Sequence, residues 1–284
     1  MHEGRMGRGW RLTKQSWSVI RATPAVMVFP FASTLLTLAA ALVLLGPWSL
    51  DIGQHHSKTA IFIATAVCAY PFTVISTYFN VALYLMADAA MSGRGMTVGD
   101  AFRGATRRWQ TICLWALVTT AVGLVLRALE QIPGGGTPAR IVTEWIADAA
   151  WALISFFVVP AIAVEGLGTR AAMRRSASTI RTTWGETVTG SIAIGALAVA
   201  VGVGAAVLGA IGFAVRDGNV IVGDAFLAVA AAVLAAAFVA QMALAEVFRL
   251  AVFRYATGTG ATGPFSPDDL AAVFKPRRRR WLFR

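Results

Sequence analysis

The chain has 284 residues, of which 57% are hydrophobic and only 14% are charged. With a mean hydropathy of +0.67, it is too apolar for a water-soluble domain, and its composition is that of a protein with several membrane-spanning helices. Lys and Arg outnumber Asp and Glu by 25 to 14, an excess that suits either nucleic acid or an anionic membrane surface.

Six segments are apolar and long enough to cross about 30 Å of hydrocarbon at about 1.5 Å per residue. We predict spans at residues 24–47, 60–87, 110–130, 143–165, 187–215 and 220–250. The first is longer than the apolar core of a signal peptide, so we interpret it as a retained helix. Pro71 and Pro160 lie inside the second and fourth spans, where each should kink the helix and release a carbonyl for a neighbouring helix to satisfy. The sequence thus predicts an all-α, six-span membrane domain over residues 1–259, followed by a short helix and a polybasic tail over residues 260–284.

A basic amphipathic segment precedes each odd-numbered span, at residues 8–21, 97–109 and 169–190. In the last of these, Thr169 is placed to cap a helix, and the apolar and basic side chains fall on separate stripes. The apolar stripe contains Met173, Ala177, Ile180 and Trp184, and the basic stripe contains Arg170, Arg174 and Arg181. We expect all three segments to be helices lying in the membrane surface. The chain then consists of three similar units, each a surface helix, a span, an outer turn and a returning span, which suggests a threefold internal repeat.

Basic residues are segregated by this arrangement. Twenty-one of the 25 Lys and Arg fall on the side that holds both termini, and the other side holds Lys58, Arg127, Arg140 and Arg216. By the positive-inside rule both termini are cytoplasmic. We expect anionic membrane lipids as partners on this side, and no nucleic acid. The predicted headgroup contacts are Arg11, Arg21, Arg103, Arg107, Arg108, Arg170, Arg174, Arg175, Arg181, Arg277, Arg278, Arg279 and Arg280.

Small residues recur every four positions in the fifth and sixth spans. They are Ala198, Gly202, Ala206, Ala210 and Ala214 in the fifth span, and Ala228, Ala232, Ala236 and Ala240 in the sixth. Because small residues let helices approach closely in lipid, these two spans are predicted to form a tight pair. Alternatively, the ridges face a second copy of the chain or a partner protein.

An acid lies near the inner end of each returning span: Asp88, Glu165 and Glu246. A carboxylate is unfavourable at a helix C-terminus, so each acid needs a basic partner. Arg249 lies one turn from Glu246, and arginines of the surface helices are the nearest candidates for the other two acids. We consider two interpretations: ion pairs that clamp the surface helices to the spans, or, together with Asn80, a polar cleft open to the cytoplasm that binds a lipid headgroup or a cation.

Other candidate ligands are weaker. Glu144 and Asp148 lie four residues apart near the outer start of the fourth span, but without a nearby histidine we expect them to pair with arginines such as Arg127. His55 and His56 are adjacent in the first outer loop, where the expected state is a solvated loop.

Catalytic motifs are absent from the sequence: it has no HExxH motif, no glycine-rich phosphate loop and only three histidines. Cys68 and Cys113 lie in apolar runs without metal-ligand spacing. We therefore expect no metal, no cofactor and no enzymatic activity, and a cytoplasmic face that binds anionic lipid and serves as a platform for partners. The alternatives are a transporter or lipid-moving protein with an inward-facing polar cleft and, third, an intramembrane enzyme.

Several segments together resemble a known family. They are SWSVIRATPAVMVFPFAS, YFNVALYLMA, VVPAIAVEG, RRSASTIRTTWGE and FRLAVFRYATG. Over nearly the whole chain, from Gly9 to Phe274, the sequence resembles a prokaryotic family of six-span proteins of unknown function. The resemblance implies the six-span fold and the prokaryotic cytoplasmic membrane, with no catalytic residues to carry over. A more distant likeness, to the membrane domain attached to some glycerophosphodiester phosphodiesterases, brings no chemistry, because their soluble catalytic barrel is not in this sequence.

Overall fold

The computed structural model describes residues 5–49, 58–130, 138–183, 192–216, 218–258 and 263–265. Every regular element among these residues is a helix, which confirms the predicted all-α class. The chain divides into two compact units. Unit 2 is Val28–Thr183, and unit 1 combines Met1–Met27 with Trp184–Arg284. Each unit is described by itself.

Five helical segments of the described part are long and apolar enough to cross a membrane. They are Pro24–Leu44, Val67–Met91, Trp109–Ala128, Ile146–Val164 and Val220–Thr257. These five segments match predicted spans one to four and six. The fifth predicted span corresponds to helix α9 (Ile192–Arg216), of which Gly204–Arg216 forms a shorter apolar segment, so its crossing of the membrane stays a prediction.

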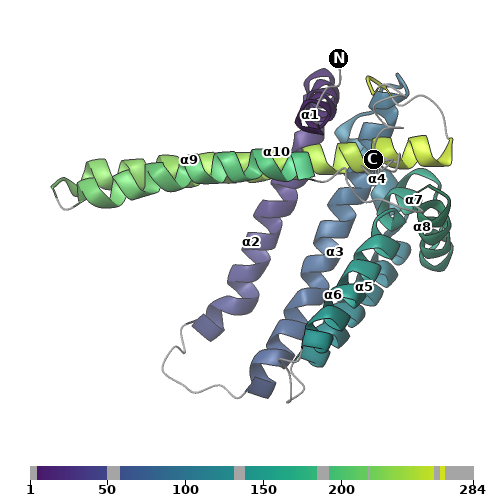
Figure 1. Ribbon diagram of the computed structural model, residues 1–284, viewed down its shortest axis with the longest axis horizontal. Helices are drawn as coiled ribbons and strands as arrows, with labels where there is room; N and C mark the ends of the chain where they lie inside the picture. Colours follow the sequence, from purple (N-terminus) through teal and green to yellow (C-terminus); the bar gives the residue numbers. More distant parts are fainter. Residues whose placement is uncertain are drawn as a thin grey trace, which may run out of the picture. The chain divides into compact units, whose positions relative to one another are not determined.

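Helix α3 (Lys58–Met91) organises unit 2, since it contacts four other helices of the unit. They are α2 (Val28–Ser49), α4 (Val98–Thr106), α5 (Trp109–Glu130) and α7 (Val158–Val164). The unit is completed by α6 (Pro138–Ser155), which lies along α5, and by α8 (Thr169–Thr183), which contacts α6 and α7 (Figure 1). Pro71 lies inside α3 without interrupting it.

Helix α4 is fixed to the spans by aromatic contacts. Phe102 of α4 packs edge-on against Phe29 of α2 and Phe79 of α3, with ring centroids 5.2 and 5.6 Å apart. The Tyr78 hydroxyl lies 2.9 Å from that of Thr106. At its start, α4 carries the capping box that the Thr and Asp spacing predicts. Its position on α3 is therefore set by packing as well as by local sequence.

The fourth span is broken. Helix α6 ends at Ser155 and α7 begins at Val158, because Pro160 has no N–H and its ring excludes the carbonyl of residue 156 from a regular turn. The buried Phe157 N–H donates instead to the Ser176 hydroxyl of α8, at 3.1 Å. The predicted disturbance of the helix at Pro160 is confirmed and takes the form of a break. The group that α8 satisfies at the break is the Phe157 amide N–H, whereas a carbonyl was predicted.

Helix α8 has an exposed basic stripe, as predicted: Arg170, Arg174 and Arg181 are all exposed. The face of α8 that is buried against the protein differs from the predicted apolar stripe. The most buried side chains are Thr169, Ala172, Ser176 and Thr179, whereas Met173, Ala177 and Ile180 are half-buried. The helix therefore packs on the protein through small and hydroxyl-bearing residues, because these can satisfy the open backbone at the break in the fourth span. Trp184 lies outside the described residues.

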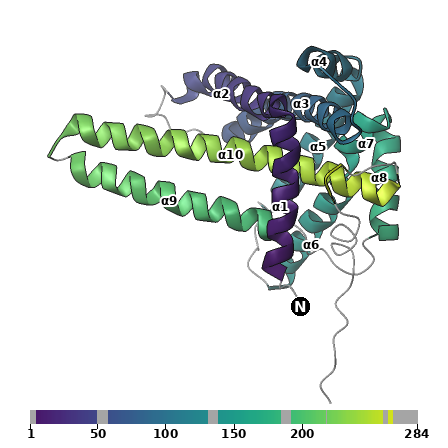
Figure 2. The same cartoon turned by 90° about the horizontal axis from the view of Figure 1, so that it is seen from above.

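In unit 1, helix α1 (Arg5–Ala22) is followed by a 3-10 turn, η1 (Pro24–Met27), and contacts the hairpin formed by α9 and α10 (Val220–Thr257) (Figure 2). The hairpin confirms the predicted tight pair. Its closest approach is near the turn, where a Cβ on Gly223 would lie 2.7 Å from the Arg216 Cα.

The predicted small-residue ridges do not make this contact. In α9 the described ridge residues Ala206, Ala210 and Ala214 are exposed, and in α10 Ala228, Ala232 and Ala236 are exposed too. Near the turn, the buried small residues are instead Ala205 and Gly212 in α9, and Gly223 and Ala230 in α10, seven residues apart in each helix. The predicted ridges were therefore wrong as the contact between the two helices, because a four-residue period does not by itself say which stripe faces the neighbour. An interface with a second copy or a partner through the exposed ridges stays a prediction.

The helix order supports the layout of three similar units: α1, α4 and α8 each precede a span and a returning segment. The returning segments also end alike, with a left-handed glycine at Gly93, Gly166 and Gly258. Helix α10 runs to Thr257, beyond the predicted end at residue 250, and at 38 residues is about 57 Å long. It stops only where Gly258 provides the left-handed cap.

Candidate functional site

Each of the three predicted acids lies beside an arginine. Glu165 accepts three hydrogen bonds from Arg175 of α8, at 2.9 to 3.1 Å. Arg249 lies 3.1 Å from Glu246, as predicted. These pairs compensate carboxylates that are only 18% and 13% exposed.

For Asp88, the ion pair that the structure shows is with Arg94, at 2.6 Å. The sequence prediction placed an arginine of the surface helix here. Arg94 instead belongs to the turn before α4, because the left-handed Gly93 reverses the chain immediately after α3 and brings the next side chain back.

A polar cleft that the three acids would line together stays a prediction. All three carboxylates contact a guanidinium, and neither of the two cavities described below includes them or the half-buried Asn80. The contacts of the three acids agree with the interpretation as ion pairs that tie neighbouring segments together. The clearest case is Glu165, which is bound by Arg175 of α8.

Arg108, at the turn between α4 and α5, joins two parts of unit 2. Its Nε donates to the Ile162 carbonyl at 3.1 Å, and its Nη1 donates to the Gly104 carbonyl at 2.8 Å. Burial lowers the pKa of Arg108, and the neighbouring charge of Arg107 lowers it further. The hydroxyl of Thr169, which the sequence placed as a helix cap, donates to the Thr111 carbonyl of α5 at 3.3 Å. The α4–α5 turn and the start of α8 are therefore held together.

A basic cavity of about 300 Å³ lies at this junction. It is lined by Leu85, Met96, Asp100, Arg103, Gly104, Arg107 and Arg108. Asp100 is already engaged: hydrogen bonds from the Thr97 hydroxyl and backbone, together with the charge of Arg103, hold the pKa of its carboxyl below the usual range. Arg107 is exposed and has no ion-pair partner among the side chains that the structure describes. The cavity therefore carries a net positive charge.

Helix α8 carries further exposed arginines. Within the described ranges, Arg170, Arg174 and Arg181 have no ion-pair partner, whereas Arg175 of the same helix is used by Glu165. Of the other predicted headgroup contacts, Arg21 is exposed above the Trp17 ring, at 5.9 Å from its centroid. The side chain of Arg11 and the tail residues Arg277 to Arg280 lie outside the described part of the chain.

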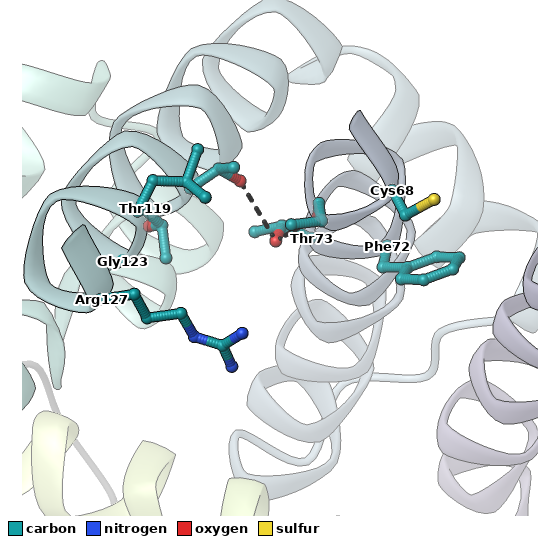
Figure 3. Close-up of a pocket in the computed structure, with 9 residues that line it drawn as sticks. Cys68, Phe72, Thr73, Thr119, Gly123 and Arg127 are labelled. Atoms are coloured by element: carbon teal, nitrogen blue, oxygen red, sulfur yellow. Dashed lines mark hydrogen bonds between the residues drawn. The ribbon is translucent and has the colours of Figure 1, made fainter. Parts of the chain in front are cut away.

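A second cavity, of about 350 Å³, lies between α3 and α5, and sequence reasoning missed it. Its lining residues are Cys68, Ala69, Phe72, Thr73, Thr119, Thr120, Gly123, Leu124 and Arg127. Figure 3 shows Arg127 extending across the groove from α5 toward α3. The signal in the sequence was the spacing of Thr119, Gly123 and Arg127, which lie four apart and share one face of α5.

The remaining predictions fall largely outside the described part. His55 and His56, and the side chains of Glu144 and Glu130, are not described. Asp148 is exposed. Among the described residues, no group of three or more metal-ligating side chains comes together, and Cys68 and Cys113 are free thiols.

The helices and their apolar surfaces define a polytopic α-helical membrane protein. The chain belongs to a family of unknown function (DUF6159), whose model matches residues 59–264, from α3 to just beyond α10. No curated protein matches the chain. The comparisons lend no support to the distant likeness to glycerophosphodiester phosphodiesterases.

Proposed function

We propose that this protein is a non-enzymatic component of the prokaryotic cytoplasmic membrane whose cytoplasmic face binds anionic phospholipid. The observation that carries the proposal is the set of exposed arginines without ion-pair partners on the α4–α5 turn and on α8: Arg107, Arg170, Arg174 and Arg181. Arg108 of the turn donates to a carbonyl of α7, and Thr169 at the start of α8 donates to a carbonyl of α5, so both segments are held on the same group of helices.

Fixed arginines suit this role for two reasons. Each basic residue near an anionic leaflet contributes about 1 kcal/mol of attraction. A guanidinium also donates two hydrogen bonds to one phosphate, and less entropy is lost when its helix is already held in place. The basic cavity beside Arg107 offers room for a single phosphate group.

The orientation belongs to the proposal. The positive-inside rule puts this face, both termini and the polybasic tail in the cytoplasm. A face held at the membrane surface in this way is suited to presenting a platform to partner proteins. We do not extend the proposal to transport, since the acids expected to line a cleft contact arginines. The likeness to the phosphodiesterase membrane domains stays a hypothesis about architecture.

Spin-labelled lipids provide the test. The full chain is reconstituted in phosphatidylcholine, and the association of spin-labelled phosphatidylglycerol is compared with that of spin-labelled phosphatidylcholine. In the triple variant Arg170→Gln, Arg174→Gln, Arg181→Gln, we expect the preference for phosphatidylglycerol to fall at least about tenfold, from three contributions of about 1 kcal/mol reduced by screening.

The matched control replaces the same three arginines by lysine, which retains the charge and should retain most of the preference. Arg175 is left unchanged, because its removal would leave Glu165 unpaired. If the glutamine variant keeps the wild-type preference, these arginines do not bind anionic lipid and the proposal fails.

A further inference from the structure

The groove between α3 and α5 combines features that a simple packing defect lacks. Its walls are mostly apolar, with Phe72, Leu124 and Gly123 prominent, and it lies within two segments that are apolar and long enough to span the membrane. At one end it carries a guanidinium, that of Arg127, and at its centre a row of threonines. Figure 3 shows Arg127 extending from α5 toward α3, and Phe72 on the side of α3 away from Arg127.

Two of the polar groups have no partner among the residues that the structure describes. The Thr119 hydroxyl oxygen is buried without a hydrogen bond, although Thr73 and Thr120 lie within 3.4 Å of each other. An unsatisfied buried hydroxyl is costly, more so where no water competes. Arg127 is exposed, and no described side chain forms an ion pair with it. The groove therefore offers one hydrogen-bonding group in its interior and one cation at its end.

We infer that the α3–α5 groove binds one anionic phospholipid, with its phosphate on Arg127, its ester region toward Thr119 and an acyl chain along Phe72 and Leu124. Residues 119 and 127 are separated by about 12 Å along the helix, and the long arginine side chain covers part of that rise. A phospholipid has oxygens at two levels, in the phosphate and in the esters, and so can serve both groups. A fatty acid has oxygens only at one end of its chain, which leaves Thr119 unsatisfied.

This site is separate from the face in the proposed function. Arg127 lies near the end of α5 opposite Arg107 and Arg108, so a lipid here comes from the other leaflet and touches none of the arginines of α4 or α8. Failure of one proposal leaves the other standing, because the variants that test them do not overlap.

Gly123 makes a sharp test feasible. A Cβ at this position meets nothing within 4 Å, so Gly123→Leu adds a side chain that fills the groove without a clash at its base. Leucine is also a better helix former than glycine. The matched control is Gly209→Leu in α9, where a Cβ likewise meets nothing within 4 Å but no groove residue is involved.

The experiment is native mass spectrometry of the full chain released from nanodiscs of phosphatidylcholine containing one-tenth phosphatidylglycerol. We expect wild type and Gly209→Leu to retain one tightly held phosphatidylglycerol. Gly123→Leu should lose it, and Arg127→Gln should hold it about tenfold more weakly, as expected for one charge-assisted contact. Arg127→Lys should lie between wild type and the glutamine variant, and Thr119→Val should also reduce retention.

Competition identifies the ligand. Adding oleate or inorganic phosphate at equal concentration should not displace the phospholipid. Equal displacement by oleate would show a fatty-acid site, and displacement by phosphate would show an anion site without an acyl chain; either result overturns the inference. So does equal retention in wild type, Gly123→Leu and Arg127→Gln.

Discussion

At the scale of single residues, the charged side chains of unit 2 divide into those used by the protein and those left to its surroundings. Arg175 and Arg108 each have partners across a turn, whereas Arg107 and Arg174 have none in the described part. All four lie within two neighbouring segments. The difference is one of position, since Arg108 and Arg175 reach partners in α7 and at its end, whereas Arg107 and Arg174 are exposed.

The Glu165–Arg175 pair should measurably stabilise the fold. Because the glutamate is only 18% exposed and accepts three hydrogen bonds, we expect a coupling of about 1–2 kcal/mol in a double-mutant cycle of Glu165→Gln and Arg175→Gln. Thermal unfolding of the purified protein measures it.

An exposed pair provides the control. Arg216 and Asp224 at the α9–α10 turn are 48% and 51% exposed, so the same cycle there should give less than about 0.5 kcal/mol. A coupling for Glu165 and Arg175 no larger than this would mean that the inner pair does not clamp α8.

The Ser176 hydroxyl should contribute to the stability of the fold, although serine is a small residue. Ser176→Ala leaves the Phe157 N–H buried without an acceptor, and we expect a loss of about 1–3 kcal/mol in unfolding free energy. Ser178→Ala, on the exposed side of the same helix, should change stability by less than about 0.5 kcal/mol. Equal effects from the two variants would contradict this account of the break in the fourth span.

Sequence reasoning reached some of these contacts and missed others. It assigned Arg249 to Glu246 because the two lie one helical turn apart, and it assigned an arginine of the following surface helix to Glu165 because that helix begins directly after the span. The Arg94 partner of Asp88 depends on the left-handed Gly93, and the Ser176 contact depends on how α8 is rotated on α7. Neither rotation nor turn conformation is written in residue spacing alone. The groove threonines looked scattered, because they come from two helices whose facing sides were unknown.

At the scale of elements, α4 shows how local chemistry and packing agree. Its capping box is written in the sequence, and its aromatic contacts fix it against α3. The lowered pKa of Asp100 adds a pH dependence to this helix start. A carboxyl with a depressed pKa contributes stability above its ordinary pKa, and that contribution disappears as the pH falls through the lowered value.

Hydrogen exchange of the first-turn amides of α4 tests this directly. At pH 7, Thr97→Ala and Asp100→Asn should each make these amides exchange several-fold faster than in wild type, as expected for loss of a cap. As the pH falls below the ordinary range of a carboxyl and through the lowered pKa of Asp100, the difference between wild type and Asp100→Asn should shrink, because Asp100 itself becomes protonated. A difference that persists unchanged down to the lowest pH at which the wild-type protein stays folded would show that the carboxylate charge is not what holds the cap.

Span positions were more predictable than span contacts. Apolar length placed most helix starts and ends within a few residues of the observed ones, because membrane thickness sets a minimum length. The extension of α10 to Thr257 was missed, since the helix continues past any membrane boundary until a glycine stops it. The packing phase of α9 and α10 was wrong, as several small-residue stripes coexist on two alanine-rich helices.

At the scale of the whole molecule, orientation is the property on which the proposed function depends. Single cysteines in a background with Cys68→Ala and Cys113→Ala test it. Gly218→Cys, in the α9–α10 turn, should react with a membrane-impermeant maleimide in intact cells. Gly95→Cys, in the turn between α3 and α4, should react only after the cells are permeabilised.

The two sites are chosen because both are exposed glycines in turns of the described part. Reaction of both from the same side would place an even number of crossings between them, in place of the predicted three. Reaction of both in intact cells would remove the basic face from the cytoplasm. It would leave the groove between α3 and α5 intact as a lipid site.

The bond between Phe157 and Ser176 has a consequence for how the chain is made. The acceptor that satisfies the broken span is synthesised 19 residues after the donor. As the fourth span leaves the ribosome and enters the bilayer, its break has no partner, and it gains one only when α8 has emerged and folded back. Membrane integration of this span is therefore completed late, and a chain whose synthesis pauses while Ser176 is still inside the ribosome should hold the span in an immature state that proteases and insertion factors can still reach.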